Sequence, residues 1–151
     1  GCIAEEADNP TAPIFHHLAG SFHYLFNHEY ARQPLRFPQK MIDSCLQIYQ
    51  EELFPLGTAI GFAEIDWVYC LTRSLRQCHH RPEECLAALE DFAIRYCSYL
   101  CSIDAQTDDS FNDLHALFGA VCALAELQNA LPGQIRTPRP LRLVLDRRPF
   151  I

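Results

Sequence analysis

Acidic and imidazole side chains cluster at separated points of this 151-residue sequence, in combinations that can move protons. Glu64 and Asp66 stand two residues apart, and the only tryptophan, Trp67, follows directly. The other clusters are Asp108, Asp109, Asn112, Asp113 and His115, and the adjacent pair His16 and His17. Two carboxyl groups in different surroundings can serve as general acid and general base, which is the chemistry of glycoside hydrolysis.

The candidate catalytic residues are therefore Glu64, Asp66 and Asp113. A carboxylate beside a helix N-terminus stays ionised and can act as a base, whereas one in an apolar pocket stays protonated and can act as an acid. The pair that we single out is Glu64 or Asp66 opposite Asp113. An aromatic ring can stack on a flat ligand such as a sugar. The candidate substrate-binding residues are Trp67, His16, Asn112 and His115.

Each of these residues also has a structural interpretation. Asp109 fits the N-cap of a helix, and Glu64 and Asp66 can complement the positive end of a helix dipole. Trp67 belongs to the residue types that are largely buried in proteins. His115 lies in a mostly apolar segment, where a histidine can simply be a hydrogen-bonded part of the core.

Motifs for other chemistries are not found in the sequence. It has no Gly-rich phosphate loop, nucleophile elbow or His-Glu-x-x-His motif. The eight cysteines include no Cys-x-x-Cys pair and are interpreted as small core hydrophobes. A metal site built from Cys78, His79, His80 and Cys85 would need ligands on both sides of a helix break. We therefore expect neither a metal nor a cofactor.

Composition restricts the class of protein and its partners. Hydrophobic residues make up 49% of the chain and charged residues 21%, which is typical of one folded domain over residues 1–151. The net charge of -7 argues against nucleic acid and against anionic membrane surfaces as partners. No apolar run approaches the roughly 20 residues of a membrane span. No signal peptide opens the sequence, which favours the cytoplasm.

Prolines and glycines divide the chain into five predicted helices, at residues 13–28, 38–53, 63–78, 81–101 and 109–130. The first and fifth are apolar on nearly all sides and are expected to be buried, whereas the second and fourth are amphipathic. This inner–outer alternation is typical of antiparallel hairpins stacked around a common axis. Residues 141–146 are expected to form a short strand or an extended segment.

If the first, third and fifth helices are the inner set, they run parallel and their N-termini open on one rim. Free backbone N–H groups and positive dipole ends gather there. The candidate carboxylates, histidines and tryptophan would share that rim.

With this alternation and the segment GFAEIDW at 61–67, the sequence resembles part of an (α/α)6 toroid of the six-hairpin glycosidase type, over residues 13–133. The resemblance implies a cleft at the N-terminal ends of the inner helices, with paired carboxylates and aromatic platforms for sugars. Glu64, Asp66 and Trp67 would occupy such places. Because five helices stand where twelve are expected, we expect the chain to be the C-terminal portion of a longer protein.

Two functions follow as expectations. The first is the C-terminal part of a carbohydrate-active, glycoside hydrolase-like enzyme that binds a carbohydrate or another small molecule. The alternative is a non-catalytic α-helical module that packs against the rest of its own chain or against a partner protein. A concave acidic cleft containing Trp67 would favour the first, and a large exposed apolar face would favour the second.

Overall fold

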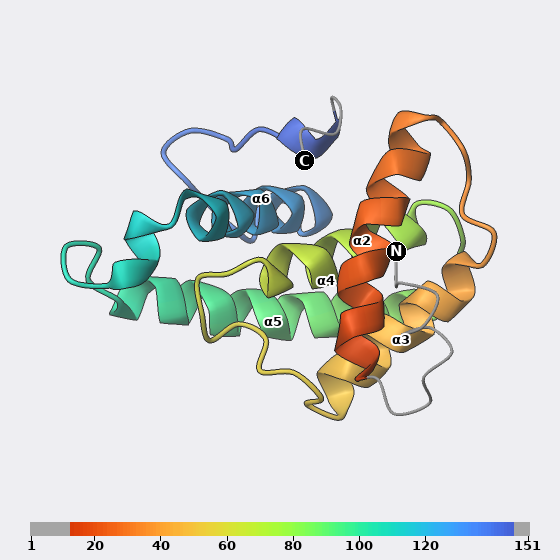
Figure 1. Ribbon diagram of the computed structural model, residues 1–151, viewed down its shortest axis with the longest axis horizontal. Helices are drawn as coiled ribbons and strands as arrows, with labels where there is room; N and C mark the ends of the chain where they lie inside the picture. The colour runs from red at the N-terminus through yellow and green to blue at the C-terminus, as the bar shows by residue number, and fades with distance from the viewer. Residues whose placement is uncertain (1–12, 147–151) are drawn as a thin grey trace.

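The computed structural model describes residues 13–146, and this part of the chain is all-helical, as the sequence predicts. Its α-helices are α2 (Ile14–Tyr30), α3 (Pro38–Gln50), α4 (Ala63–Leu75), α5 (Pro82–Ser102) and α6 (Leu114–Ala130) (Figure 1). Two 3-10 turns complete it, η1 (Asp109–Asn112) and η2 (Val144–Asp146). The predicted bounds agree with these helices to within a few residues, apart from the start of α6.

Proline and aspartate set the helix starts. α3 and α5 begin at Pro38 and Pro82, where the missing N–H of proline costs no helical hydrogen bond. The predicted helix from 109 is broken, because η1 forms a separate turn before α6. Asp113 caps α6, and its Oδ1 accepts hydrogen bonds from the backbone N–H groups of His115 at 2.8 Å and Ala116 at 3.3 Å.

α4 is the central helix of the fold. All its residues except Leu75 are buried, and it packs against α2, α3, α5 and α6 (Figure 1). The expectation that the first and fifth helices are the buried ones is wrong. Tyr24 on α2 is 57% exposed and Leu114 on α6 is 80% exposed. An all-round apolar surface did not predict burial for these two helices, because α2 and α6 each have only one face against α4.

Trp67 lies in the core, so its interpretation as a ligand platform is wrong. Its side chain has no exposed surface and its ring lies 4.9 Å from that of Tyr49 and 5.0 Å from that of Phe92, between centroids. The indole N–H donates a 2.8 Å hydrogen bond to the carbonyl oxygen of Cys45. This bond satisfies the polar atom that burial removes from water and ties α4 to α3.

A buried ionic junction joins four elements. Arg73 of α4 forms ion pairs with Glu29 of α2, Glu126 of α6 and Asp146 of η2, and its guanidinium lies over the Tyr69 ring. Arg73 is 2% exposed and Glu126 1% exposed. A buried guanidinium requires such partners, because an unpaired buried charge is strongly unfavourable.

Residues 131–146, which we call the strap, return along α6 on the side away from α4 and α5 (Figure 1). The Gln128 side chain donates to the carbonyl oxygen of Ile135 at 3.2 Å and accepts from the N–H of Leu141 at 2.8 Å. Leu145 is 5% exposed and anchors the end of the strap. The strap contains no strand, and within the segment 141–146 the last three residues form the 3-10 helix η2, so the expected strand or extended segment is not found there.

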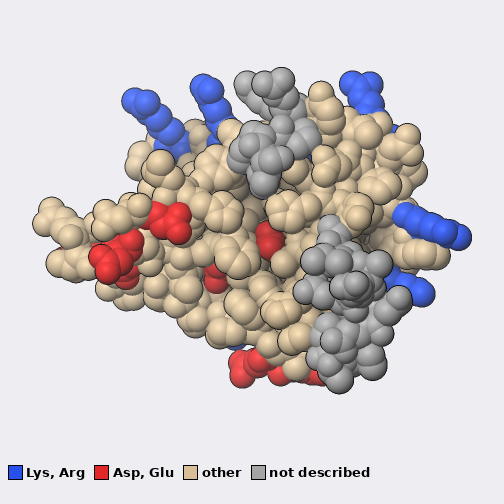
Figure 2. All heavy atoms as spheres, viewed as in Figure 1, with Lys and Arg blue, Asp and Glu red and all other residues tan. Residues whose placement is uncertain are grey.

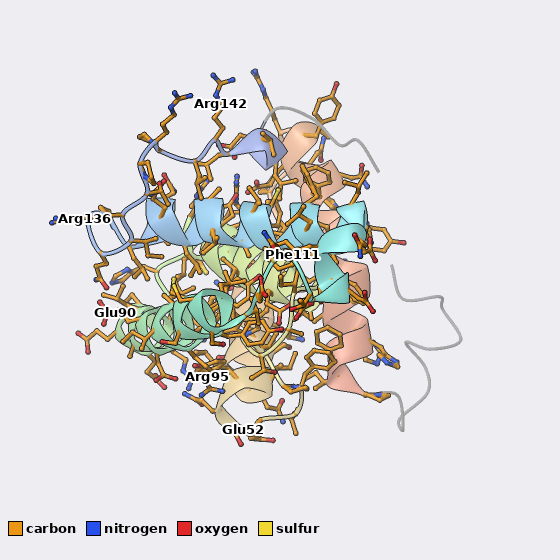
Figure 3. All side chains as sticks on the ribbon, turned by 90° about the vertical axis from the view of Figure 1, so that its left-hand side faces the viewer. Glu52, Glu90, Arg95, Phe111, Arg136 and Arg142 are labelled. Carbon is orange, nitrogen blue, oxygen red and sulfur yellow. The ribbon has the colours of Figure 1, made fainter. Side chains whose placement is uncertain are left out.

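The described helices do not form the parallel inner set that the sequence predicts. Both ribbon views show α2 standing steeply across α4 and α6 (Figures 1 and 3). The N-terminus of α2 is therefore turned away from those of α4 and α6. The closed toroid remains a prediction.

Candidate functional site

One pocket among the described residues is lined by a buried carboxyl group, two histidines and several aromatic rings, and we call it the Asp66 pocket. It lies where the middle of α2, the start of α4, the first half of α6 and η2 meet, and its cavity volume is about 80 Å³. Its lining residues are Phe22, His23, Phe62, Ile65, Asp66, His115, Phe118, Gly119, Cys122 and Leu145. No lysine or arginine lines it, so the pocket itself supplies no positive partner for the carboxyl group of Asp66.

Helical spacing brings these side chains to the pocket. Phe62 and Asp66 are one turn apart, and the Asp66 N–H donates to the Phe62 carbonyl oxygen at 3.0 Å. On α6, His115, Phe118 and Cys122 follow at intervals of three and four residues, which places them on one helix face.

Gly119 allows α6 to approach the start of α4. A Cβ atom at this position would lie 2.7 Å from the carbonyl oxygen of Gly61, closer than real Cβ contacts allow. The absence of a side chain therefore sets the distance between the Phe62 and His115 sides of the pocket.

Asp66 is the chemically unusual group. It is 4% exposed, and within residues 13–146 its carboxyl group has no hydrogen-bond partner. Burial raises the pKa of Asp66 to about 8, and the nearby charge of Glu64 adds to the effect. This shift favours the protonated carboxylic acid, which is the state that a general acid requires.

Glu64 belongs to a different environment. It is 1% exposed, and its Oε1 accepts a 3.2 Å hydrogen bond from the backbone N–H of Gly57. Burial raises the pKa of Glu64, and hydrogen bonds from backbone N–H groups oppose that rise. Because residues two apart on a helix face different directions, Glu64 packs under the loop before α4 and does not line the Asp66 pocket.

Aromatic and imidazole rings form the rim. The His115 ring stacks on Phe62 with 6.0 Å between centroids and 15° between planes. Phe62 is 49% exposed, so it offers ring surface to a ligand. Burial lowers the pKa of His23, as does the charge of His115 across the rim, and both effects favour its neutral form.

The structure brings two of the seven predicted site residues, Asp66 and His115, into the pocket. Asp113 is exposed as the cap of α6, and Asn112 is exposed at the end of η1. His16 is exposed near the start of α2 and does not line the pocket, which α2 reaches at Phe22 and His23. The pairing of Glu64 or Asp66 with Asp113 across one cleft is therefore not found.

Sequence reasoning missed Phe62, Phe118 and His23. A signal existed for two of them, because Phe62 precedes Asp66 by four residues and Phe118 follows His115 by three. The role of aromatic platform was assigned to Trp67, next to Asp66, and not to Phe62. For His23 no local pattern exists, since its place depends on the crossing angle of α2.

Comparison with known proteins does not assign this chain to a family. Comparison with protein-family models finds no match, and comparisons with curated proteins and with solved structures find none either. Over residues 13–146, no three or more His, Cys, Asp or Glu side chains converge in a way that could hold a metal ion. No described helix is long and apolar enough to cross a membrane.

Proposed function

We propose that the Asp66 pocket is an acid–base site for a carbohydrate ligand, in a protein that is part of a glycoside hydrolase-like enzyme. The observation that carries the proposal is the buried carboxyl group of Asp66, which lines the pocket without a hydrogen-bond partner among the described residues. The raised pKa of this group favours its acidic form. A ligand oxygen at the pocket would be its natural acceptor.

The proposed step is hydrolysis of a glycosidic bond. Asp66 gives its proton to the departing oxygen as the bond from that oxygen to the anomeric carbon breaks. Water adds to the anomeric carbon, and the neutral imidazole of His23 accepts the proton that the water loses. The exposed ring of Phe62 would stack on the apolar face of the sugar.

The test is release of reducing sugar from a panel of glycosides, with Asp66→Asn as the decisive variant. We expect Asp66→Asn to lower the rate at least 100-fold and to leave ligand affinity within a few-fold, because asparagine keeps the shape but has no acidic proton. Glu64→Gln is the matched control and should retain most of the rate. Full activity of Asp66→Asn, or no hydrolysis of any glycoside by the wild type, would reject the proposal.

A second candidate is an interaction module, favoured by one observation. Leu114 and Val121, seven residues apart, form an apolar stripe on one face of α6, and they are 80% and 45% exposed. Exposed apolar side chains on one helix face are typical of a face that packs against another domain or chain. The two functions are compatible if the rest of a larger enzyme covers this stripe.

A further inference from the structure

The strap carries a positive charge that the rest of the chain does not share. The strap, residues 131–146, has a net charge of +2, whereas residues 1–130 have a net charge of -11. Arg136, Arg139 and Arg142 are exposed and follow one another at intervals of three residues. Figure 2 shows Lys and Arg side chains standing out along the upper edge, where the strap lies, and at the right-hand edge, with Asp and Glu at the left, the centre and the bottom of that view.

These arginines are held in place relative to the Asp66 pocket. The strap is bound to α6 through Gln128 and to α4 through the Asp146–Arg73 ion pair. Its Leu145 forms part of the pocket wall, only three residues after Arg142. Three residues of extended chain span at most about 10 Å, so the row of arginines ends close to the pocket.

The arginine side chains are available for a ligand. Within the part of the chain that the structure describes, Arg136, Arg139 and Arg142 form no ion pair. The side chains of Arg136 and Arg142 point away from the helices (Figure 3). The acidic groups nearest the end of the strap, Asp146 and Glu126, are already paired with Arg73.

Resting on the proposed function above, we propose that the substrate is a linear polysaccharide bearing carboxylates, which lies along the strap arginines and enters the Asp66 pocket at one end. Guanidinium groups bind carboxylates through two parallel hydrogen bonds, which gives both attraction and orientation. The acidic remainder of the surface repels a polyanion, so the strap is the favourable line of approach. A nucleic acid duplex is broader than the strap and would face the acidic body as well.

The experiment measures binding of an oligogalacturonate of about eight units by calorimetry at low and moderate salt. The test variant carries Arg136→Gln, Arg139→Gln and Arg142→Gln. A matched variant removes three positive charges elsewhere, with Arg32→Gln, Arg36→Gln and Lys40→Gln, all of which are exposed. A third variant replaces the strap arginines by lysine, which keeps the charge.

We expect the wild type to bind the oligogalacturonate and not a neutral maltooligosaccharide of equal length. The strap glutamine variant should bind at least tenfold more weakly, the matched variant within twofold of wild type, and the lysine variant in between. Affinity should fall as salt is added, because the arginines are exposed. Equal loss in the strap and matched variants would overturn the inference, as would tighter binding of a single-stranded oligonucleotide of equal charge.

Asp66→Asn separates this inference from the proposed function. If oligogalacturonate binds through the strap but Asp66→Asn does not change its cleavage, the acid–base role of Asp66 fails and the anionic ligand stands. If neutral glycosides are cleaved in an Asp66-dependent way and the strap variants change nothing, the function stands and the anionic substrate is rejected.

Discussion

At the residue scale, the position of Asp66 makes stability depend on pH in a direction opposite to that of most carboxyl groups. Burial raises its pKa to about 8 in the folded state, against 3.8 in the unfolded chain. Between these values the unfolded state binds fewer protons than the folded state, so this group lowers the free energy of unfolding as pH rises.

We predict that Asp66→Asn removes this decline, whose slope has a maximum of about 1.4 kcal/mol per pH unit. Urea unfolding at pH 5, 6.5 and 8 checks the prediction. The variant should gain stability relative to wild type as pH increases and should be the more stable protein at pH 8. Parallel curves for the two proteins would show that Asp66 ionises normally.

Trp67 gives a second prediction at this scale, because its role is structural. Trp67→Phe removes the hydrogen bond to Cys45 and leaves a partly empty site between Tyr49 and Phe92. We expect a loss of about 2–4 kcal/mol in the free energy of unfolding. At a temperature where both proteins are folded, the variant should bind sugar with the affinity of wild type. A large loss of affinity would show that Trp67 contributes to ligand binding.

At the scale of elements, the Arg73 junction holds α2, α4, α6 and η2 together. Arg73→Met leaves Glu126 buried without its main partner, and we predict a loss of about 3–5 kcal/mol. Adding Glu126→Gln should recover a large part of this loss, because the uncompensated charge is then gone. Chemical unfolding of the two single variants and the double variant completes the cycle, and strictly additive losses would contradict a coupled pair.

Gly119 controls how α6 meets the loop before α4. Alanine usually stabilises a helix relative to glycine by about 1 kcal/mol. Here the added Cβ atom would meet the backbone oxygen of Gly61, so we predict that Gly119→Ala destabilises the fold by about 1–3 kcal/mol. Ligand affinity should also fall, since Phe62 and His115 move apart, and the two effects are measured by thermal unfolding and by sugar titration.

These elements also show what sequence patterns could and could not predict. Helix existence was readable from proline positions such as Pro38 and Pro82 and from hydrophobic spacing, and Asp66 and His115 were readable as candidates by type. The extent of burial of α2 and α6 could not be predicted, because the sequence does not indicate which part of an apolar helix surface a neighbouring helix covers. The pocket depends on the crossing of α2 and on the return of the strap, which are long-range contacts without a local signature.

At the scale of the whole molecule, the apolar stripe on α6 is an exposed surface through which two chains could pack. We predict that the wild-type chain associates as its concentration increases and that a variant with Leu114→Glu and Val121→Lys remains smaller. Both side chains are well exposed, so the substitutions should change the free energy of unfolding little. Light scattering over a concentration series tests this, and a wild-type chain that stays monomeric would show that the stripe does not drive association.

The closure of the Asp66 pocket by Leu145 has a consequence for how the protein is made. The pocket draws its walls from residues as early as Phe22 and as late as Leu145, so they leave the ribosome far apart in time. A nascent chain that has produced every α-helix described here still lacks one wall. The ability to bind ligand should therefore arrive late in synthesis, and proteolytic nicking within the strap should abolish it while the helices persist.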